Sequence, residues 1–227
     1  MDIFGQALSD YYYRHAPETL WLHNTYGEPE EMPVDVFFRR EEEMPELELL
    51  ALEQCQGKVL DIGSGVGSHA LLLQEEDLDV TALEICKDAC GIMKHRGIKK
   101  IMNTDIFTLS GSRFDTLLLL MNGIGLCGDV KRLTLLLQHF RRLLSPGAKI
   151  LFDSSDISYL YENEERPEQK YLGEVSYQYE YKDVRGPWFN WLYIDANTMS
   201  KIAAREGYHF RLLYDDGQDQ YLACLET

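Results

Sequence analysis

The sequence predicts an α/β fold in which helices cover both faces of a mostly parallel sheet. Three observations support this prediction. Apolar segments with the length of strands alternate with segments of helical composition from about residue 57 to residue 153. One predicted strand, residues 58–62, runs directly into a loop with three glycines. Another, residues 114–121, is apolar almost throughout, which is typical of a parallel strand with helices on both faces.

Length and composition narrow the possible classes of protein. A chain of 227 residues with 45% hydrophobic residues can bury one large core, so we expect a single domain with additions. No apolar run approaches the roughly 20 residues of a membrane span, and the N-terminus does not resemble a signal peptide. The five cysteines include no C-x-x-C pair, so we expect reduced thiols, no metal site and a soluble, cytoplasmic protein.

The charge of the chain disfavours nucleic acid as a partner. Acidic residues outnumber basic ones 38 to 22, which gives a formal net charge of −16. Proteins that grip duplex DNA or RNA gain most of their affinity by neutralising phosphates with Lys and Arg. The acidic runs, such as residues 28–31 and 41–43, are most simply solvated surface.

Residues 1–56 precede the first predicted core strand, and we expect them to form a helical cap on a core of residues 57–227. Phe4, Leu8 and Tyr11 lie on one helical stripe. A second apolar helix is predicted from about Pro45 to Gln54.

The glycine loop is the first candidate site. Gly63, Gly65 and Gly67 stand between the strand at 58–62 and a predicted helix at 68–75. Backbone without Cβ atoms can approach a ligand closely, and the amides at a helix N-terminus favour electron-rich groups. The alternative is a tight turn that uses glycine for its geometry alone. Ser64 and His69 resemble part of a hydrolase triad, but no G-x-S-x-G elbow accompanies them.

A carboxylate at the end of the second strand, residues 79–84, adds to this signal. Glu84 follows Gly63 by 21 residues, and an acid at this spacing in a βαβ nucleotide fold accepts hydrogen bonds from both ribose hydroxyls. A solvated acid at a strand end is the alternative. Asp61 precedes the loop. It would repel a pyrophosphate but could help to hold a cationic, amino-acid-bearing ligand, through the ammonium group of the ligand or through an ordered water.

This combination resembles the class I S-adenosylmethionine-dependent methyltransferases, over roughly residues 55–153. Their first motif is an acidic residue followed by G-x-G-x-G, here Asp61 to Gly67, and a ribose-binding acid follows the second strand, here Glu84. The resemblance implies a Rossmann-like three-layer α/β/α sandwich with a seven-stranded, mostly parallel sheet and an antiparallel last strand. It also implies S-adenosylmethionine as cofactor and S-adenosylhomocysteine as product.

The resemblance extends to the next two strands. After a helix at 85–96, which Gly97 ends, residues 98–102 are expected as the third strand, and Asp105 and Ile106 would contact the adenine. An Asx turn or a helix cap is the alternative role for Asp105. The segment after strand four would lie beside the methyl group. The expected cofactor-binding residues are therefore Asp61, Gly63, Ser64, Gly65, Gly67, Glu84, Ile85, Asp105, Ile106, Met121, Asn122 and Gly123.

The last third of the chain departs from the pattern. A helix capped by Asp129 and a fifth strand at 148–152 fit the family, but residues 154–195 form an insertion. Within it, residues 175–181 and 188–194 are expected to form an antiparallel aromatic ribbon. The ribbon could pack against the domain or a second subunit, or it could wall the acceptor pocket. A helix capped by Asn197 and a terminal hairpin, 208–214 with 221–225, complete the chain.

The sequence does not identify catalytic residues. Methyl transfer from a sulfonium depends mainly on alignment, and a base is needed only when the acceptor must lose a proton. Possible bases are Asp153, His15, His23 and the ribbon tyrosines. Residues 11–15 and Tyr26 are either core contacts or part of a lid over the cofactor. The chain lacks the Asp/Asn-Pro-Pro-aromatic motif of enzymes that methylate adenine or amide nitrogens, which argues against those acceptors.

We therefore expect an S-adenosylmethionine-dependent methyltransferase with a small-molecule acceptor, acting as a monomer or homodimer. Two other functions share most of these features. One is an NAD(P)-dependent oxidoreductase, which would use the same ribose acid. The other is a non-catalytic protein that binds S-adenosylmethionine.

Overall fold

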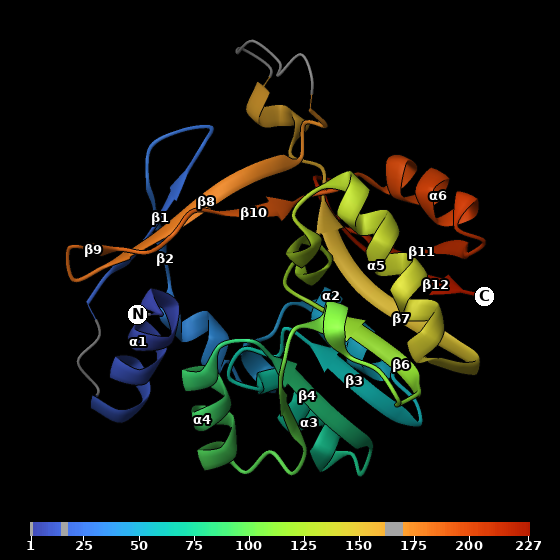
Figure 1. Ribbon diagram of the computed structural model, residues 1–227, viewed down its shortest axis with the longest axis horizontal. Coiled ribbons are helices and arrows are strands. Elements are labelled where there is room, and N and C mark those ends of the chain that lie inside the picture. Colours follow the sequence, from blue (N-terminus) through green and yellow to red (C-terminus); the bar gives the residue numbers. More distant parts are fainter. Residues whose placement is uncertain (1, 15–17, 162–169) are drawn as a thin grey trace.

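A computed structural model describes residues 2–14, 18–161 and 170–227, which form two sheets (Figure 1). The larger, which we call the core sheet, has seven strands in the order β11-β12-β7-β6-β3-β4-β5. Only β12 runs antiparallel to its neighbours. This confirms the predicted mostly parallel sheet. Its strands are β3 (Lys58–Ile62), β4 (Asp79–Glu84), β5 (Ile101–Asn103), β6 (Phe114–Leu119), β7 (Leu144–Ser155), β11 (His209–Asp215) and β12 (Gln220–Glu226).

Helices cover both faces of the core sheet, as predicted. Successive residues of a strand point to opposite faces, so Val59 and Leu60 contribute to different hydrophobic clusters. The cluster with Leu60 includes α5 and α6, and the cluster with Val59 includes α2, α3 and α4. These helices are α2 (Glu46–Glu53), α3 (Ser68–Glu75), α4 (Lys87–Arg96), α5 (Val130–Leu143) and α6 (Ala196–Arg205).

Local sequence signals explain most helix ends. Asp129 accepts a hydrogen bond from the Arg132 amide at 2.7 Å and caps α5, as predicted. Gly97, with φ of 98°, ends α4. The predicted cap of α6 was wrong: Asp195 accepts from the Thr198 amide at 2.8 Å, because a capping side chain must stand before the first helical turn, and Asn197 already lies inside it.

The third core strand is shorter than the expected 98–102. The Ile98 amide donates to the Met93 carbonyl at 3.1 Å, so this residue completes the end of α4. The strand β5 therefore begins only at Ile101.

The smaller sheet, which we call the roof sheet, joins two parts of the chain that are distant in sequence. It has the order β10-β8-β1-β2, and β9 pairs with β8. The predicted aromatic ribbon is confirmed, since Tyr177 on β8 stands opposite Phe189 on β10. The strands are β1 (Leu20–Asn24), β2 (Glu30–Met32), β8 (Glu174–Tyr181), β9 (Val184–Arg185) and β10 (Phe189–Leu192).

The expectation that residues 1–56 are a helical cap was only partly right. The helix α1 (Ile3–Ser9) continues as a π-helical turn, Asp10–Arg14, but the segment then forms β1 and β2. Leu20 and Leu22 on β1 are buried and alternate with more exposed residues, so β1 buries one face against β8. Tertiary pairing with the insertion therefore decided the structure of this segment.

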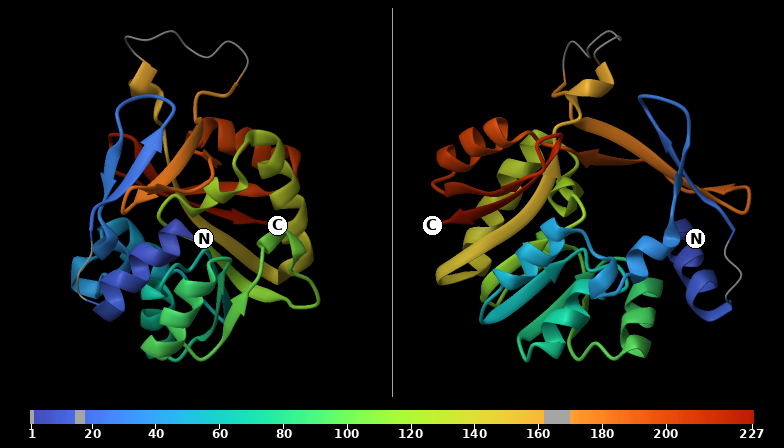
Figure 2. Two further views of the ribbon diagram at one scale, coloured as in Figure 1. Left: turned by 60° about the vertical axis from the view of Figure 1, so that its left-hand side comes forward. Right: turned by 180° about the vertical axis from the view of Figure 1, so that it is seen from behind.

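The helix α1 connects the roof sheet to the core. The buried Asp10 accepts hydrogen bonds from Lys182 Nζ at 2.6 Å and Tyr181 Oη at 3.2 Å, both at the end of β8. On its other side α1 packs on α4 so closely that a Cβ on Gly5 would lie 2.9 Å from Cys86 Sγ. In Figures 1 and 2 the roof sheet extends from β7 across to α1.

Three general properties of the described residues concern membrane spans, cysteines and metal ligands. Among the helices of the described ranges, none is long and apolar enough to cross a membrane. The five cysteines are free thiols, and four of them are buried. The described ranges contain no cluster of three His, Cys, Asp or Glu side chains that could hold a metal ion.

Candidate functional site

The predicted site residues meet at one edge of the core sheet. Asp61 and the glycine loop end β3, Glu84 ends β4, Asp105 follows β5, and Met121 to Gly123 follow β6. These four strands are adjacent and parallel, so their carboxyl ends lie at the same edge. The topology thus brings together residues that are up to 62 positions apart, from Asp61 to Gly123.

The glycine loop presents open backbone at Gly63. Gly63 and Gly65 have φ of 74° and 54°, in the left-handed region, and a Cβ on Gly63 would meet no atom within 4 Å. Amides of Gly63 and Ser64 donate to the Leu83 carbonyl at 2.9 and 3.1 Å, which fixes the loop on β4. Gly67 has a different role: its Cβ would lie 3.0 Å from Met93 Cγ, so it permits the packing of α4.

Glu84 is a buried carboxylate held by backbone amides. It accepts hydrogen bonds from the Gly65 amide at 2.9 Å and from the Cys86 amide at 2.8 Å, one on each oxygen. Burial raises the pKa of Glu84, while these amides oppose the rise. Each oxygen keeps a free lone pair, so the carboxylate can still accept from a pair of hydroxyls.

Asp61 is the second buried carboxylate of the site. In the described part of the chain its Oδ2 atom has no hydrogen-bond partner, which is costly for a buried acceptor. Burial raises the pKa of Asp61, and the neighbouring His69 opposes the rise. His69 Nε2 lies 2.7 Å from Glu48 Oε2, and Arg39 donates to Glu48 Oε1 at 2.6 Å. An ammonium donor would satisfy the free oxygen of Asp61.

The residues expected at the adenine differ in accessibility. Ile85 is 70% exposed and can pack on a flat ligand, whereas Ile106 is buried in the core against α5 and α6. Asp105 caps a short 3-10 helix through the Phe107 amide at 2.9 Å, which is the alternative weighed for it. Asn103 was not predicted; its side chain donates to the carbonyls of Glu84 and Ile85, both at 2.9 Å, and fixes their backbone. The only signal for it was a polar residue at a strand end.

The turn after β6 is conformationally strained and is held by Asp153. Met121 and Asn122 have φ of 59° and 55°, which residues with a Cβ seldom adopt. The Asn122 amide donates to both carboxylate oxygens of Asp153 at 3.0 Å, and Gln220 donates to one of them at 3.2 Å. Asp153 is fully buried, and burial raises its pKa to about 6. It therefore positions this turn, and Gln220, missed from the sequence, supports it.

The other candidate bases and lid residues are distributed differently. His23 is on the outer face of the roof sheet, 2.8 Å from Glu180, and His15 lies outside the described residues. Tyr11 stacks on Phe38, and Tyr12 hydrogen-bonds to His95. Of the lid candidates in the described ranges, Tyr26 alone joins the aromatic cluster on the inner face of the roof sheet.

Three aromatic residues cover the glycine loop. The Phe37 ring is 3.9 Å from the position of a Cβ on Gly65. Phe4 packs edge-on against Phe37 and stacks on Tyr179, with ring centroids 5.0 and 5.2 Å apart. Burial raises the pKa of Tyr179, and the Glu84 charge adds to the rise. The roof sheet therefore approaches the glycine loop and Glu84, and no local sequence pattern predicted this contact.

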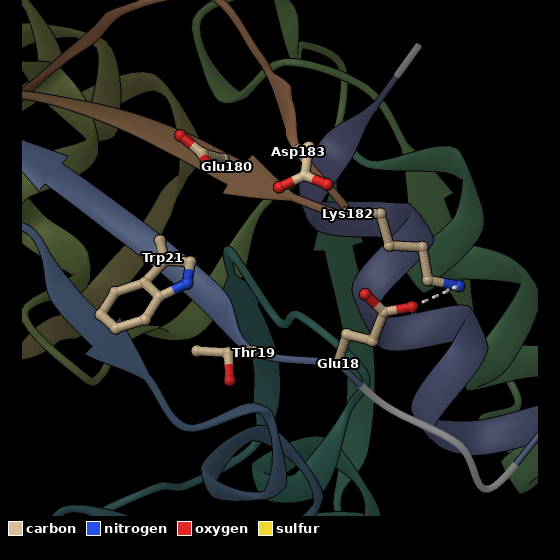
Figure 3. A pocket seen from close by; sticks show the side chains of 6 residues that line it. All are labelled: Glu18, Thr19, Trp21, Glu180, Lys182 and Asp183. Carbon is tan, nitrogen blue, oxygen red and sulfur yellow. Dashed lines mark ion pairs between the residues drawn. The ribbon is translucent and has the colours of Figure 1, made fainter.

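Two surface hollows lie away from this edge. One, of about 390 Å³, is lined by the side chains in Figure 3, and another, of about 350 Å³, adjoins it at Trp21 and Glu180. Trp21 and Glu180 are paired in register and are on the outer face of the roof sheet, opposite to the face that bears Tyr179. The hollows are therefore separate from the glycine loop. The first is lined by Glu18, Thr19, Trp21, Glu180, Lys182 and Asp183.

Comparison with known proteins identifies the family. The family described as "Methyltransferase domain" matches residues 38–209. The chain belongs to the class I S-adenosylmethionine-dependent methyltransferases. A methyltransferase from Bacteroides fragilis, crystallised with S-adenosyl-L-homocysteine, is 37% identical. The alignment covers 99% of this chain and 94% of that one, with a TM-score of 0.90.

More distant structures share the fold of this methyltransferase. CalS10, an amino pentose methyltransferase from Micromonospora echinaspora, has a TM-score of 0.56 at 15% identity and covers 88% of this chain and 100% of its own. KedS8, a sugar N-methyltransferase from Streptoalloteichus, has a TM-score of 0.57 at 14% identity, covering 88% and 95%. A search of curated protein sequences found no match.

The site fits the cofactor of the family. Asp61 Oδ2, which has no hydrogen-bond partner among the described residues, suits an ammonium group. Glu84 can still accept hydrogen bonds from a ribose, and the open backbone at Gly63 allows a ligand to pack closely. The cofactor of this methyltransferase is S-adenosylmethionine, and its product is S-adenosylhomocysteine. The alternative of an NAD(P)-dependent oxidoreductase is therefore excluded.

Proposed function

We propose that this methyltransferase methylates a small-molecule acceptor, and that its cofactor is held mainly by Glu84 and Asp61. The observation that carries the assignment of these two residues is their pairing: two buried carboxylates end adjacent strands, and the glycine loop joins them through the Gly65 amide. Glu84 would bind the ribose hydroxyls and Asp61 the ammonium group.

The remaining roles follow from position along the edge of the sheet. Ile85 and Asp105 would contact the adenine, the first with exposed apolar surface and the second with a carboxylate oxygen. Met121 to Gly123 would line the reacting centre in the turn that Asp153 holds. When bound, S-adenosylmethionine supplies an electrophilic methyl group on a sulfonium. The protein's contribution is to hold donor and acceptor in line and to exclude water.

A small acceptor is supported by the roof sheet and by charge. The roof sheet stands over the carboxyl edge of the core sheet (Figure 2), and its inner face carries a cluster of aromatic side chains. An edge that is covered in this way suits a compact ligand better than an extended duplex. The net charge of −16 adds repulsion against phosphate backbones. Two proteins of the same fold are named as amino pentose and sugar methyltransferases, which agrees with a small acceptor.

A matched pair of variants tests the cofactor assignment. Glu84→Gln removes the ribose-binding charge, whereas Asp79→Asn removes an acid from the opposite end of the same strand, where it pairs with Lys100. We expect the first change to weaken S-adenosylhomocysteine binding at least tenfold, about 1.4 kcal/mol, and the second to leave it unchanged. Calorimetric titration measures both. Equal affinities for wild type and Glu84→Gln would refute the assignment.

Turnover separates an enzyme from a binding protein on the same fold. With an acceptor present, the enzyme converts S-adenosylmethionine to S-adenosylhomocysteine, which mass spectrometry detects. A protein that binds the cofactor tightly and yet forms no product with any acceptor fraction would be a binding protein.

A further inference from the structure

The inner face of the roof sheet carries a cluster of three tyrosine hydroxyls. Tyr26 Oη lies 3.0 Å from Tyr177 Oη, which in turn donates to Tyr193 Oη at 3.1 Å. The three residues come from the turn after β1, from β8 and from the segment after β10. Hydroxyl oxygens that meet in this way offer lone pairs to a ligand that donates hydrogen bonds.

Aromatic rings surround these hydroxyls. Phe189 lies 6.1 Å from Tyr177 and 6.4 Å from Trp191, measured between ring centroids. Tyr26, Phe189, Trp191 and Tyr193 all pack in one cluster but remain only partly buried. Apolar rings left partly exposed beside convergent polar groups are typical of a ligand site.

The cluster adjoins the segment after β6, which is proposed above to line the reacting centre. Trp191 packs against the segment after the Asn122 turn, so closely that a Cβ on Gly125 would lie 2.3 Å from the Trp191 indole nitrogen. The amide next to Tyr193, that of Ile194, donates to Ser154 Oγ at 3.0 Å, beside Asp153 on β7. These contacts hold the segment that bears Tyr193 beside the Asn122 turn and the end of β7.

The charges around this space are negative. Burial raises the pKa of the Tyr193 hydroxyl, and the carboxylates of Glu30 and Asp153 add to the rise, so both acids act on this group. The cations of the roof sheet are paired elsewhere: Lys182 with Asp10 at 2.6 Å, and Arg185 with Glu180 at 2.5 Å on the outer face. A positive charge that develops beside the tyrosines is stabilised by the two carboxylates and by the faces of the rings.

We propose that the acceptor is a small amine, which binds between the Asn122 turn and the Tyr26–Tyr177–Tyr193 cluster and is methylated on nitrogen. This rests on the proposed function. The lone pair of the neutral amine forms the new nitrogen–carbon bond while the carbon–sulfur bond breaks and its electrons stay on sulfur. The positive charge thus moves from sulfur to nitrogen. An amine that arrives as an ammonium ion first gives its proton to solvent, and the methyl transfer itself then needs no base.

Nitrogen is favoured over oxygen by the same charges. An alcohol must lose its proton to attack well, and the carboxylates of Asp153 and Glu30 disfavour an alkoxide nearby. An amine instead gains positive charge as it reacts, in a place that favours it. The local field therefore lowers the barrier for nitrogen and raises it for oxygen.

A panel of matched compounds tests the proposal. Benzylamine, cyclohexylamine and glucosamine are compared with benzyl alcohol, cyclohexanol and glucose, first by binding to the protein saturated with S-adenosylhomocysteine, then by turnover with S-adenosylmethionine. We expect at least one amine to bind tenfold more tightly than its alcohol and to receive the methyl group. If every alcohol binds as well as its amine, or no amine binds, the proposal is wrong.

Variants locate the binding site. Tyr193→Phe removes the cluster hydroxyl whose pKa the Asp153 charge helps to raise, and Tyr12→Phe removes a hydroxyl that bonds to His95 at the surface. We expect the first to weaken amine binding at least fivefold with S-adenosylhomocysteine affinity unchanged, and the second to change neither. An unaltered amine affinity in Tyr193→Phe contradicts the site. If the wild-type protein did not bind S-adenosylhomocysteine, the proposed function itself would be contradicted.

Discussion

At the scale of single residues, the site depends on carboxylates that the fold keeps away from water. Asp61, Glu84 and Asp153 are 2%, 7% and 0% exposed, so none is simply solvated charge. Their environments differ: among the described residues Asp61 Oδ2 has no hydrogen-bond partner, Glu84 accepts from two backbone amides, and Asp153 accepts from the amide of the strained Asn122 turn. Burial raises the pKa of all three, so the folded protein keeps three carboxylates where their charged form is disfavoured.

Asp153→Asn tests this disfavoured charge through stability. A carboxyl with a pKa of about 6 in the folded state and 3.8 as its ordinary value stabilises the fold below 3.8 and loses that contribution as pH rises through 6. As pH rises from about 4.5 to about 8, ionisation of the buried Asp153 carboxyl lowers the unfolding free energy of the wild type by about 2 kcal/mol. The Asn side chain of the variant does not ionise, so its stability lacks this dependence on pH.

Urea denaturation of both proteins at the two pH values measures the difference. We expect the unfolding free energy of Asp153→Asn minus that of the wild type to be about 2 kcal/mol larger at about pH 8 than at about pH 4.5. The same variant should lose at least tenfold in turnover, because an Asn side chain cannot accept from the Asn122 amide with both of its terminal atoms. Parallel pH curves for the two proteins would contradict the role of Asp153.

At the scale of elements, glycines permit contacts between segments rather than flexibility. Gly67 allows α4 to pack on the end of the loop, and Gly125 allows β10 to rest on the segment after β6. At Gly125 a Cβ would lie 2.5 Å from the Leu192 carbonyl oxygen, a backbone atom that cannot rotate away. The position of the roof sheet over the site therefore depends on this contact.

Gly125→Ala should displace β10. We expect it to lower the unfolding free energy by at least about 2 kcal/mol and to weaken acceptor binding more than cofactor binding. Gly91→Ala in α4 is the matched control, because a Cβ there meets nothing within 4 Å and the residue is exposed. It should stabilise the protein by roughly 0.5–1 kcal/mol. Thermal denaturation and ligand titration measure both; equal stability of the two variants would refute the contact.

At the scale of the whole molecule, the two sheets enclose one site. The core sheet supplies the carboxyl edge with the proposed cofactor residues, and the roof sheet covers this edge with aromatic side chains. The roof sheet is attached at both ends, through α1 and Asp10 on one side and through β10 and Ile194 on the other. Cofactor binding should therefore slow amide exchange in both sheets.

Saturation with S-adenosylhomocysteine tests this connection. At a hundredfold excess over the dissociation constant, binding adds roughly 2.7 kcal/mol to the unfolding free energy, which raises Tm by roughly 5–10 °C for a chain of this size. We expect slower amide exchange in the glycine loop and also in β8, because Phe4 and Tyr179 link the two. NAD is the control and should change neither. Protection that stops at the core sheet would contradict this link.

Much of this protein could be predicted from local sequence. The strands β3, β4 and β6, the glycine loop and the acid at Glu84 have signals within a few residues of one another, because apolar periodicity and glycine spacing reflect local backbone geometry. Parallel strands end at one edge, so the spacing of Asp61, Glu84 and Asp105 also predicted that these three residues come together there.

Other features were decided only by the tertiary structure. The pairing of Leu22 with Tyr179 joins segments 157 residues apart (179 minus 22), and it converts part of an expected helical cap into two strands. Three other features likewise depend on which surfaces meet after folding. They are the hydrogen bond between Asp153 and the Asn122 amide, the burial of Ile106 and the packing of α4 on Gly67. Local periodicity records which face of an element is apolar but not its partner, and that choice is made by the packing of the whole chain.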